Sequence, residues 1–285
     1  MKISINLLAF VSLFLFSCQK EIHYAKGNAN VVDTSALGKF ITATGITDAT
    51  LKVNLDSLIT RARRHGWWDL CKVIYPLAGG TSTTCKYNLK DPRDSDAAFR
   101  LVFNGSTWTF DSYGIHPGAS GYGYTYFDPS IQIADPNSCH LSVYSLDDVA
   151  GGSDNGDIGA WGNGLGFYLS TRTSWPDTSG KPFTSIGNDG FQGTGVNGAG
   201  FFLATRASGT SADFYRDSLL MTSVPSSPGN LPNLNLFICN QNFGSEPYGD
   251  GFSERGLAFI TIGSGINGTM EAFMYSDIKD FVENK

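Results

Sequence analysis

The feature that most constrains the fold is a succession of short apolar and aromatic runs, each ended by glycine, proline, asparagine, aspartate or serine. Such runs between turn-forming residues are typical of β-strands. We predict strands at Val73–Tyr75, Ala97–Phe103, Thr107–Phe110, Tyr124–Phe127, His140–Leu146, Asp157–Trp161, Leu165–Thr171, Gly200–Thr205, Asp213–Tyr215, Leu219–Val224, Leu234–Cys239 and Leu257–Ile262. With 34 glycines and only 16% charged residues, the chain is predicted to be mainly β, with its strands packed as an antiparallel β-sandwich.

Two segments with helical periodicity flank the strands. In each segment the apolar side chains recur every three or four residues, which places them on one face of a helix. The first helix is predicted at about 48–65, with Thr47 or Asp48 as its N-cap, and the second at about 269–283. We therefore expect residues 39–285 to form one sandwich domain that includes one N-terminal and one C-terminal helix.

The first residues of the chain have the pattern of a secretory signal. Lys2 supplies a positive charge, and Ile3–Phe16 is almost wholly apolar. This apolar run is too short to span a bilayer of about 30 Å, which needs about 20 residues. A short apolar run that ends in a small residue predicts that residues 1–17 are a signal peptide removed on export.

A cysteine follows this apolar run directly. Leu15, Ser17 and Cys18 resemble the lipobox of bacterial lipoproteins, which implies that Cys18 is lipidated and anchors the chain to a membrane. Gln19 after the cysteine implies the outer membrane, on either its cell-surface or its periplasmic face. Residues 18–38 are polar and small, as in a tether. The alternative is an ordinary cleaved signal followed by an incidental cysteine.

The charge of the chain excludes one class of partner. The formal net charge is −6, and no block of five or more basic residues occurs. The densest basic cluster, Arg61, Arg63 and Arg64, lies at the end of the first predicted helix, where positive charge stabilises the helix dipole. We therefore expect no nucleic-acid partner.

Four further cysteines could form disulfides in an exported protein: Cys71, Cys85, Cys139 and Cys239. Four cysteines allow three pairings, and the sequence does not choose among them. Cys71 and Cys85 are the closest pair in the chain and would close a glycine-rich loop. Cys139 and Cys239 lie in predicted strands that could be neighbours, and they could equally be two buried free thiols.

Several motifs, in the same order along the chain, resemble concanavalin A-like (laminin-G-like) β-sandwich modules of bacterial surface proteins and phage tail-associated proteins. The motifs are Phe40-Ile41-Thr42-Ala43-Thr44-Gly45-Ile46-Thr47-Asp48, Ile74-Tyr75-Pro76, Asn88-Leu89-Lys90-Asp91-Pro92, Gly121-Tyr122, His140-Leu141-Ser142, Asp157-Ile158-Gly159-Ala160, Gly200-Phe201-Phe202 and Ala258-Phe259. The resemblance implies a jelly-roll sandwich over most of residues 40–281. It implies function only weakly, because lectins, adhesins, glycanases and structural modules share this fold.

Catalytic groups are sparse. Glycanases on this fold place two Glu on one face of a strand, whereas none of the five Glu here has another within five residues. An Asp pair could replace them, and Asp147 with Asp148 or Asp154 with Asp157 are available. No Gly-x-Ser-x-Gly elbow and no zinc-ligand spacing occurs. A non-catalytic protein is therefore the leading hypothesis, and a polysaccharide-degrading enzyme is the alternative.

Oxygen ligands gather between two predicted strands. Asp148, Asp154, Asn155 and Asp157 could contribute to a Ca²⁺ site, since Ca²⁺ takes six to eight oxygen ligands. The alternative is that this glycine-rich stretch is only a turn. Calcium is therefore a possible cofactor, and no other cofactor is indicated.

Aromatic residues give the remaining signal. We select five as candidate ligand contacts, namely Trp108, Tyr124, Tyr126, Trp161 and Trp175. Sugar rings can stack on aromatic faces, and core packing is the alternative for each of them. The resulting hypothesis is a membrane-anchored lipoprotein whose lectin-like sandwich binds a glycan or a surface protein. A phage-derived structural module is a further alternative.

Overall fold

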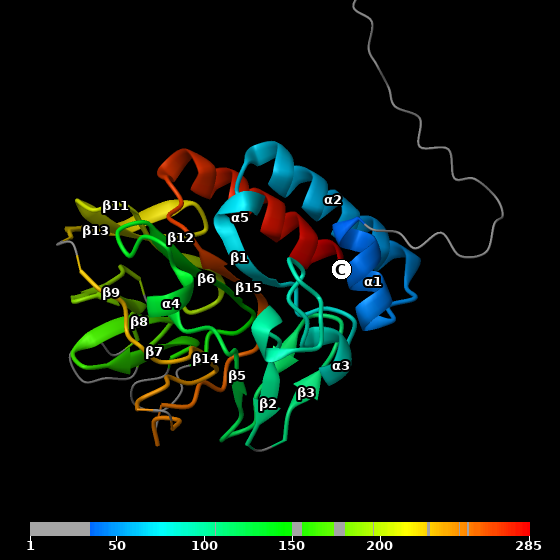
Figure 1. Cartoon of the computed structure of the whole chain (residues 1–285), viewed down its shortest axis with the longest axis horizontal. Coiled ribbons are helices and arrows are strands. Elements are labelled where there is room, and N and C mark those ends of the chain that lie inside the picture. The colour runs from blue at the N-terminus through cyan, green and yellow to red at the C-terminus, as the bar shows by residue number, and fades with distance from the viewer. Residues whose placement is uncertain are drawn as a thin grey trace, which may run out of the picture. The chain divides into compact units, whose positions relative to one another are not determined.

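The computed structural model describes most of the chain beyond its N-terminal region (Figure 1). The described residues are 35–105, 107–149, 156–173, 180–195, 197–226, 229–244, 246–249 and 251–285. They belong to one compact unit, Asp33–Lys285. The predicted signal peptide and Cys18 lie outside them, and so do Asp154, Asn155 and Trp175. No helix within these ranges has the length and apolar character needed to cross a membrane.

Two antiparallel sheets form the body of this unit. Among the described residues, the larger sheet has eight strands. In spatial order these are β13 (Leu219–Pro225), β12 (Ser211–Arg216), β11 (Gly200–Ser208), β6 (Cys139–Ser145), β15 (Leu257–Gly263), β4 (Ile115–His116) and β3 (Thr109–Phe110), with β1 (Cys71–Tyr75) also paired to β15. The central strand β15 is buried at every position, because a second sheet covers one of its faces and helices cover the other.

The second sheet has seven described strands. In spatial order they are β10 (Asp189–Gln192), β9 (Phe183–Gly187), β8 (Leu165–Ser170), β7 (Ile158–Gly162), β14 (Phe237–Ile238), β5 (Tyr122–Tyr124) and β2 (Val102–Asn104). Every pairing between strands of either sheet is antiparallel. The predicted mainly β, antiparallel sandwich is confirmed.

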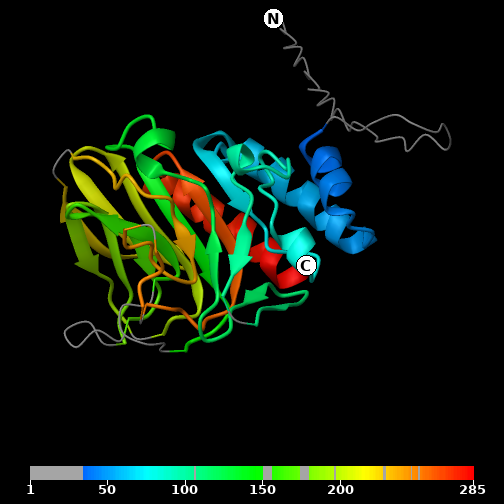
Figure 2. The same ribbon diagram turned by 60° about the horizontal axis from the view of Figure 1, so that its bottom comes forward.

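Helices form a third layer, which Figure 2 shows beside the sheets. The α-helices of the described chain are α1 (Ala36–Thr44), α2 (Ala49–His65), α3 (Ser82–Cys85), α4 (Pro129–Gln132) and α5 (Gly268–Asn284). The two predicted helices correspond to α2 and α5. Asp48 caps α2 by accepting a hydrogen bond from the Leu51 amide, and Asn267 caps α5 in the same way through Met270.

Helix α1 corrects the predicted tether, which extended to residue 38. The helix begins at Ala36, where the Ser35 hydroxyl caps it, and ends at Gly45 in the left-handed conformation. Gly38 and several β-branched residues lower its local helix propensity, so periodicity does not reveal it. Packing supplies the stability instead, because Phe40 is fully buried in the helix layer.

The apolar core has two parts. One cluster lies between the two sheets and includes Val143, Phe167 and Ile260. The other lies between the eight-stranded sheet and the helices and includes Leu55 and Phe259. The outer face of the seven-stranded sheet belongs to neither cluster, so neither apolar core covers it.

The predicted disulfides are not formed. All four cysteines are buried free thiols, an alternative that the sequence analysis gave only for Cys139 and Cys239: Cys71, Cys85, Cys139 and Cys239. Cys71 lies in the core beneath the helices, whereas Cys85 lies in the core between the sheets, so the two thiols are in different layers. Burial raises the pKa of Cys71 to about 12 and that of Cys85 to about 11, which keeps both thiols protonated.

Glu271 makes stability depend on pH. It lies in the first turn of α5, is 1% exposed, and faces Ser218 in the turn between β12 and β13. Desolvation raises the pKa of Glu271 from 4.5 to about 7, against hydrogen bonds from Ser218. Between pH 4.5 and about pH 7 the folded state then binds more protons than the unfolded state, so the contribution of Glu271 to stability is lost as pH rises towards 7.

We expect Glu271→Gln to reduce the difference between the melting temperatures at pH 5 and pH 8. An unchanged difference would contradict this.

Candidate functional site

Three aromatic side chains point outward from the seven-stranded sheet. In β7, Ile158 and Ala160 face the core, so the alternation of the strand directs Trp161 to the outer face. The same alternation turns Tyr168 of β8 and Phe183 of β9 outward. Tyr168 packs edge-on to Trp161 at 6.0 Å between ring centroids and stacks on Phe183 at 5.6 Å. The three strands thus present a continuous aromatic surface.

Glycines opposite these rings provide the room they occupy. The register pairs Trp161 with Gly166 and Tyr168 with Gly159. A Cβ on Gly166 would lie 2.7 Å from Trp161 Cε3, and one on Gly159 would lie 2.0 Å from Tyr168 Cβ. A larger residue at Gly166 would therefore displace Ser185 and the Trp161 ring, and one at Gly159 would collide with the backbone of β8 at Tyr168.

The segment after β14 adds a second wall. Cys239 adopts a left-handed conformation with φ 59°, which reverses the chain. Asn242 then bonds to β7 through its backbone: its amide donates to Gly159 O at 3.1 Å, and its carbonyl accepts from the Trp161 amide at 2.8 Å. This short parallel bridge places the residues on either side of Asn242, which are Gln241 and Phe243, beside Trp161.

Tyr248 is held in the same wall by a side-chain amide. Asn240 Oδ1 accepts a hydrogen bond from the Tyr248 amide at 2.9 Å, and Asn240 Nδ2 donates to the Tyr248 carbonyl at 3.1 Å. Asn240 is itself fully buried. The backbone of Tyr248 is therefore fixed on both sides, and its ring packs against Phe243 at 5.3 Å.

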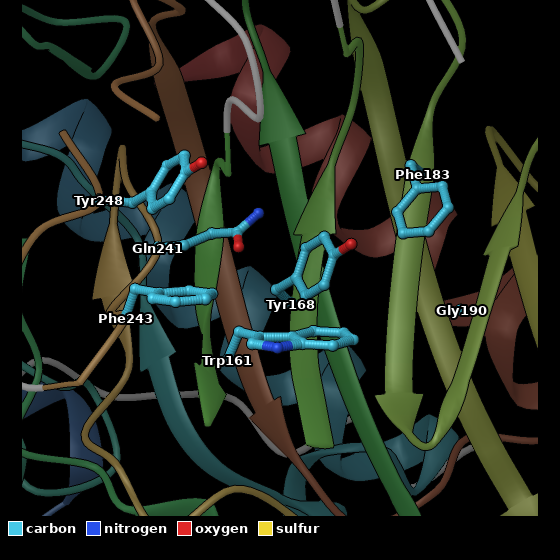
Figure 3. Close-up of a pocket in the computed structure, with 7 residues that line it drawn as sticks. All are labelled: Trp161, Tyr168, Phe183, Gly190, Gln241, Phe243 and Tyr248. Carbon is cyan, nitrogen blue, oxygen red and sulfur yellow. The ribbon is translucent and has the colours of Figure 1, made fainter. Parts of the chain in front are cut away.

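These elements enclose a cleft of about 340 Å³. Figure 3 shows its lining side chains, which are Trp161, Tyr168, Phe183, Gly190, Gln241, Phe243 and Tyr248. The volume falls within the range of about 300–1,000 Å³ typical of small-molecule sites. The lining combines aromatic faces with the Gln241 amide and two tyrosines. It contains no carboxylate, amine or imidazole among the described residues, so it offers stacking and hydrogen bonding rather than acid–base chemistry.

The predicted ligand-contact aromatics do not form one group. Trp161 lines the cleft. Trp108 instead packs on Phe103 and Phe110 at the edge of the core, with its indole N–H donating to a backbone carbonyl. Tyr124 is on β5, packs on Tyr126 and accepts a hydrogen bond from Asn235, away from the cleft lining.

The sequence did not single out the other six members of the cleft lining, which are Tyr168, Phe183, Gly190, Gln241, Phe243 and Tyr248. The one local signal for the second wall is the run of amides directly before Phe243 in a glycine-rich stretch. Its significance depends on a contact with β7, some 80 positions earlier in the chain. Periodicity does not report such contacts.

The predicted calcium site requires correction at Asp157. Its side chain is fully buried, and Oδ1 lies 2.8 Å from Arg255 Nε and accepts a hydrogen bond from the Ser253 hydroxyl. Its Oδ2 accepts from the Thr171 amide. Both oxygens are therefore already engaged inside the sandwich.

Asp148 is engaged elsewhere. It pairs with Arg172 at 2.7 Å and accepts from the Gly198 amide, and this hydrogen bond holds the pKa of Asp148 below its usual value. Asp154 and Asn155 lie outside the described residues. Within the described ranges, no group of three His, Cys, Asp or Glu side chains is placed to bind a metal.

His140 is also inaccessible to a ligand. It is fully buried in β6, with Nδ1 2.5 Å from Ser264 O and Nε2 2.9 Å from Thr261 Oγ1. Desolvation lowers the pKa of His140 to about 4, so it is neutral at pH 7. Cys71 lies 3.9 Å away, but burial keeps its thiol protonated, so this pair does not form an activated nucleophile.

Comparison with known proteins supports the fold. No protein-family model and no curated protein sequence matches the chain. One similar structure is domain 4 of AbnA, a GH43 extracellular arabinanase from Geobacillus stearothermophilus, solved in complex with arabinotriose. The match has a TM-score of 0.51 and 11% identity, and covers 72% of this chain and 98% of that domain. It shows that the β-sandwich occurs in a known solved domain.

Two further structures are less similar. A Trypanosoma rangeli sialidase mutant that displays trans-sialidase activity matches with a TM-score of 0.47 and 10% identity, over 80% of this chain and 39% of that one. The binding domain of botulinum neurotoxin serotype D matches with a TM-score of 0.43 and 8% identity, over 63% and 47%. In both cases the matched region is less than half of the other protein.

Proposed function

We propose that this protein is a non-catalytic glycan-binding module. The observation that carries the proposal is the cleft on the outer face of the seven-stranded sheet. There, the faces of Trp161, Tyr168 and Phe183 meet the Gln241 amide. Aromatic faces suit the C–H faces of sugar rings, while amide and phenol groups suit hydroxyls. The similar domain of the arabinanase was solved with a trisaccharide, which agrees with this class of ligand.

We further propose that the sandwich is of the concanavalin A-like type and that Cys18 carries a lipid anchor in the outer membrane. The ordered sequence motifs support the first statement. The apolar run before Leu15-Phe16-Ser17-Cys18 supports the second. Together they describe a lipoprotein that holds a polysaccharide near the membrane surface.

Trp161→Ala should weaken glycan binding at least tenfold. Covering one large aromatic side chain contributes about 1.5–3 kcal/mol, and about 1.4 kcal/mol corresponds to a tenfold change in affinity. A glycan array identifies the ligand, and calorimetry with that ligand measures the change. Tyr113→Ala is the matched control, because Tyr113 is 64% exposed and lies outside the cleft lining.

Several outcomes would contradict the proposal. Equal losses for Trp161→Ala and Tyr113→Ala would place the binding site elsewhere. New reducing ends during incubation with a bound polysaccharide would establish the rival, a polysaccharide-degrading enzyme. Binding of a purified surface protein but of no glycan would show that the ligand is a protein. A stable oligomer that binds neither would favour a structural module.

Cys18→Ala should abolish labelling by a clickable fatty acid and release the protein from the membrane fraction. The thiol of Cys18 is the acceptor for the lipid in the proposed anchor, so its removal leaves no site for attachment. Cys71→Ala is a control for labelling, since Cys71 is buried within the folded sandwich. Retained labelling of Cys18→Ala would disprove the anchor.

A further inference from the structure

A second hollow lies next to the cleft on the outer face of the seven-stranded sheet, and the cleft is called the first hollow from here on. Its volume is about 490 Å³. Asn163 and Gly164 of the turn between β7 and β8 line it, together with Asn233 and Leu234 from the segment before β14. Both turn residues are left-handed, with φ 54° and 76°, and a Cβ on Gly164 would meet nothing within 4 Å. The tight turn therefore leaves open space at the end of the hairpin.

Two aromatic side chains line both hollows, namely Trp161 and Phe243. Trp161 is half-buried and Phe243 is 50% exposed, so each can cover one ligand group on the side of Tyr168 and another on the side of the turn. Figure 3 shows both rings edge-on at the lower side of the first cleft. The two hollows are thus adjoining parts of one elongated surface.

The chemistry of this surface favours an uncharged ligand. Among the described lining residues of both hollows there is no lysine, arginine, histidine, aspartate or glutamate. The second hollow adds the amides of Asn163 and Asn233 to that of Gln241 in the first. A carboxylate or sulfate placed here would lose water without gaining a counter-charge, and the chain's net charge of −6 would repel it.

We infer that the site binds an internal stretch of an uncharged polysaccharide, with successive sugar units in the two hollows on either side of Trp161 and Phe243. This inference rests on the proposed glycan-binding function and adds the ligand's charge and length. Both hollows are open to solvent, so a polysaccharide chain bound in them can continue beyond them. A single sugar would occupy the first hollow, because Tyr168, Phe183 and Tyr248 line only that one.

Calorimetry with oligosaccharides of increasing length tests the inference. The probes are neutral arabino-, xylo- and cello-oligosaccharides of one to six units and oligogalacturonides of matching length, titrated into the purified full-length protein. For one neutral series we expect at least a tenfold gain in affinity between the shortest binder and a sugar longer by one to three units. The oligogalacturonides should bind at least tenfold more weakly than that series.

Two variants distinguish the contributions of the two hollows to affinity. Asn233→Trp fills the second hollow from an exposed position, so it should remove the gain in affinity with length. Tyr248→Ala removes a ring of the first hollow and should weaken every length. Affinity independent of length, a gain that survives Asn233→Trp, or tight oligogalacturonide binding would overturn the inference while leaving glycan binding intact. Absence of binding by every probe and by the glycan array would refute both proposals.

Discussion

Replacing Arg255 by methionine should lower the melting temperature by about 6–20 °C, the effect of breaking a buried ion pair worth about 3–5 kcal/mol in a domain of this size. Arg255 and Asp157 both have fully buried side chains, with Arg255 Nε 2.8 Å from Asp157 Oδ1. The guanidinium also donates to the carbonyls of Val149 and Arg172. Methionine fills much of the volume but leaves the Asp157 carboxylate without a counter-charge. Differential scanning calorimetry measures the shift.

A double variant identifies the cause of this loss. Asp157→Asn removes the negative charge and keeps one side-chain oxygen as an acceptor for the Thr171 amide, while its new NH2 group can donate to the Ser253 hydroxyl. Combined with Arg255→Met, it should therefore melt at a higher temperature than Arg255→Met alone. If Arg255→Met melts within about 2 °C of the parent protein, the pair does not stabilise the fold in the manner argued.

Asp277→Ala should destabilise the helix layer by about 2–4 kcal/mol, because it leaves a buried donor unpaired and removes a buried charge interaction. Asp277 lies on α5 and is 1% exposed. Its Oδ2 accepts from Trp67 Nε1 at 2.8 Å and lies 2.7 Å from His65 Nδ1, and its Oδ1 is 3.3 Å from Arg61 Nε. Urea unfolding followed by tryptophan fluorescence measures the change.

Another aspartate of the same helix provides the matched control. Asp280 also pairs with Arg61, but its side chain is 54% exposed, so Asp280→Ala should cost about 0–1 kcal/mol. Asp277→Asn should fall between the two alanine variants, since it retains an acceptor for Trp67. Equal effects of Asp277→Ala and Asp280→Ala would show that burial of the Asp277 network is not decisive.

Local patterns were sufficient for the long strands and the capped helices. The predicted strands at His140–Leu146 and Leu257–Ile262 correspond closely to β6 and β15, because runs rich in apolar, β-branched and aromatic residues can be recognised without knowledge of their partner strands. The adjacent strands β9 and β10 were missed. Thr184 and Ser185 of β9 are fully buried, and Gly187 and Gly190 interrupt the apolar pattern, so this hairpin looks like a loop in the sequence.

Local sequence patterns also failed to predict the partners of buried polar residues. Asp157 looked like a surface ligand because aspartate in a glycine-rich stretch is typical of a turn. Its actual partner, Arg255, is 98 positions away. The pairing forms only when β7 and the segment before β15 meet inside the sandwich. No spacing rule within a short window could reveal it.

The sequence by itself determined the class of fold, the two long helices and the presence of many aromatic residues in and between the predicted strands. Tertiary structure decided which of those aromatics form the cleft. Trp108 and Trp161 both lie in predicted strands, yet Trp108 packs against core rings while Trp161 lies opposite Gly166 and beside Asn242. The alternation along a strand assigns a side chain to a face of the sheet, whereas its neighbours on that face come from strands distant in the chain.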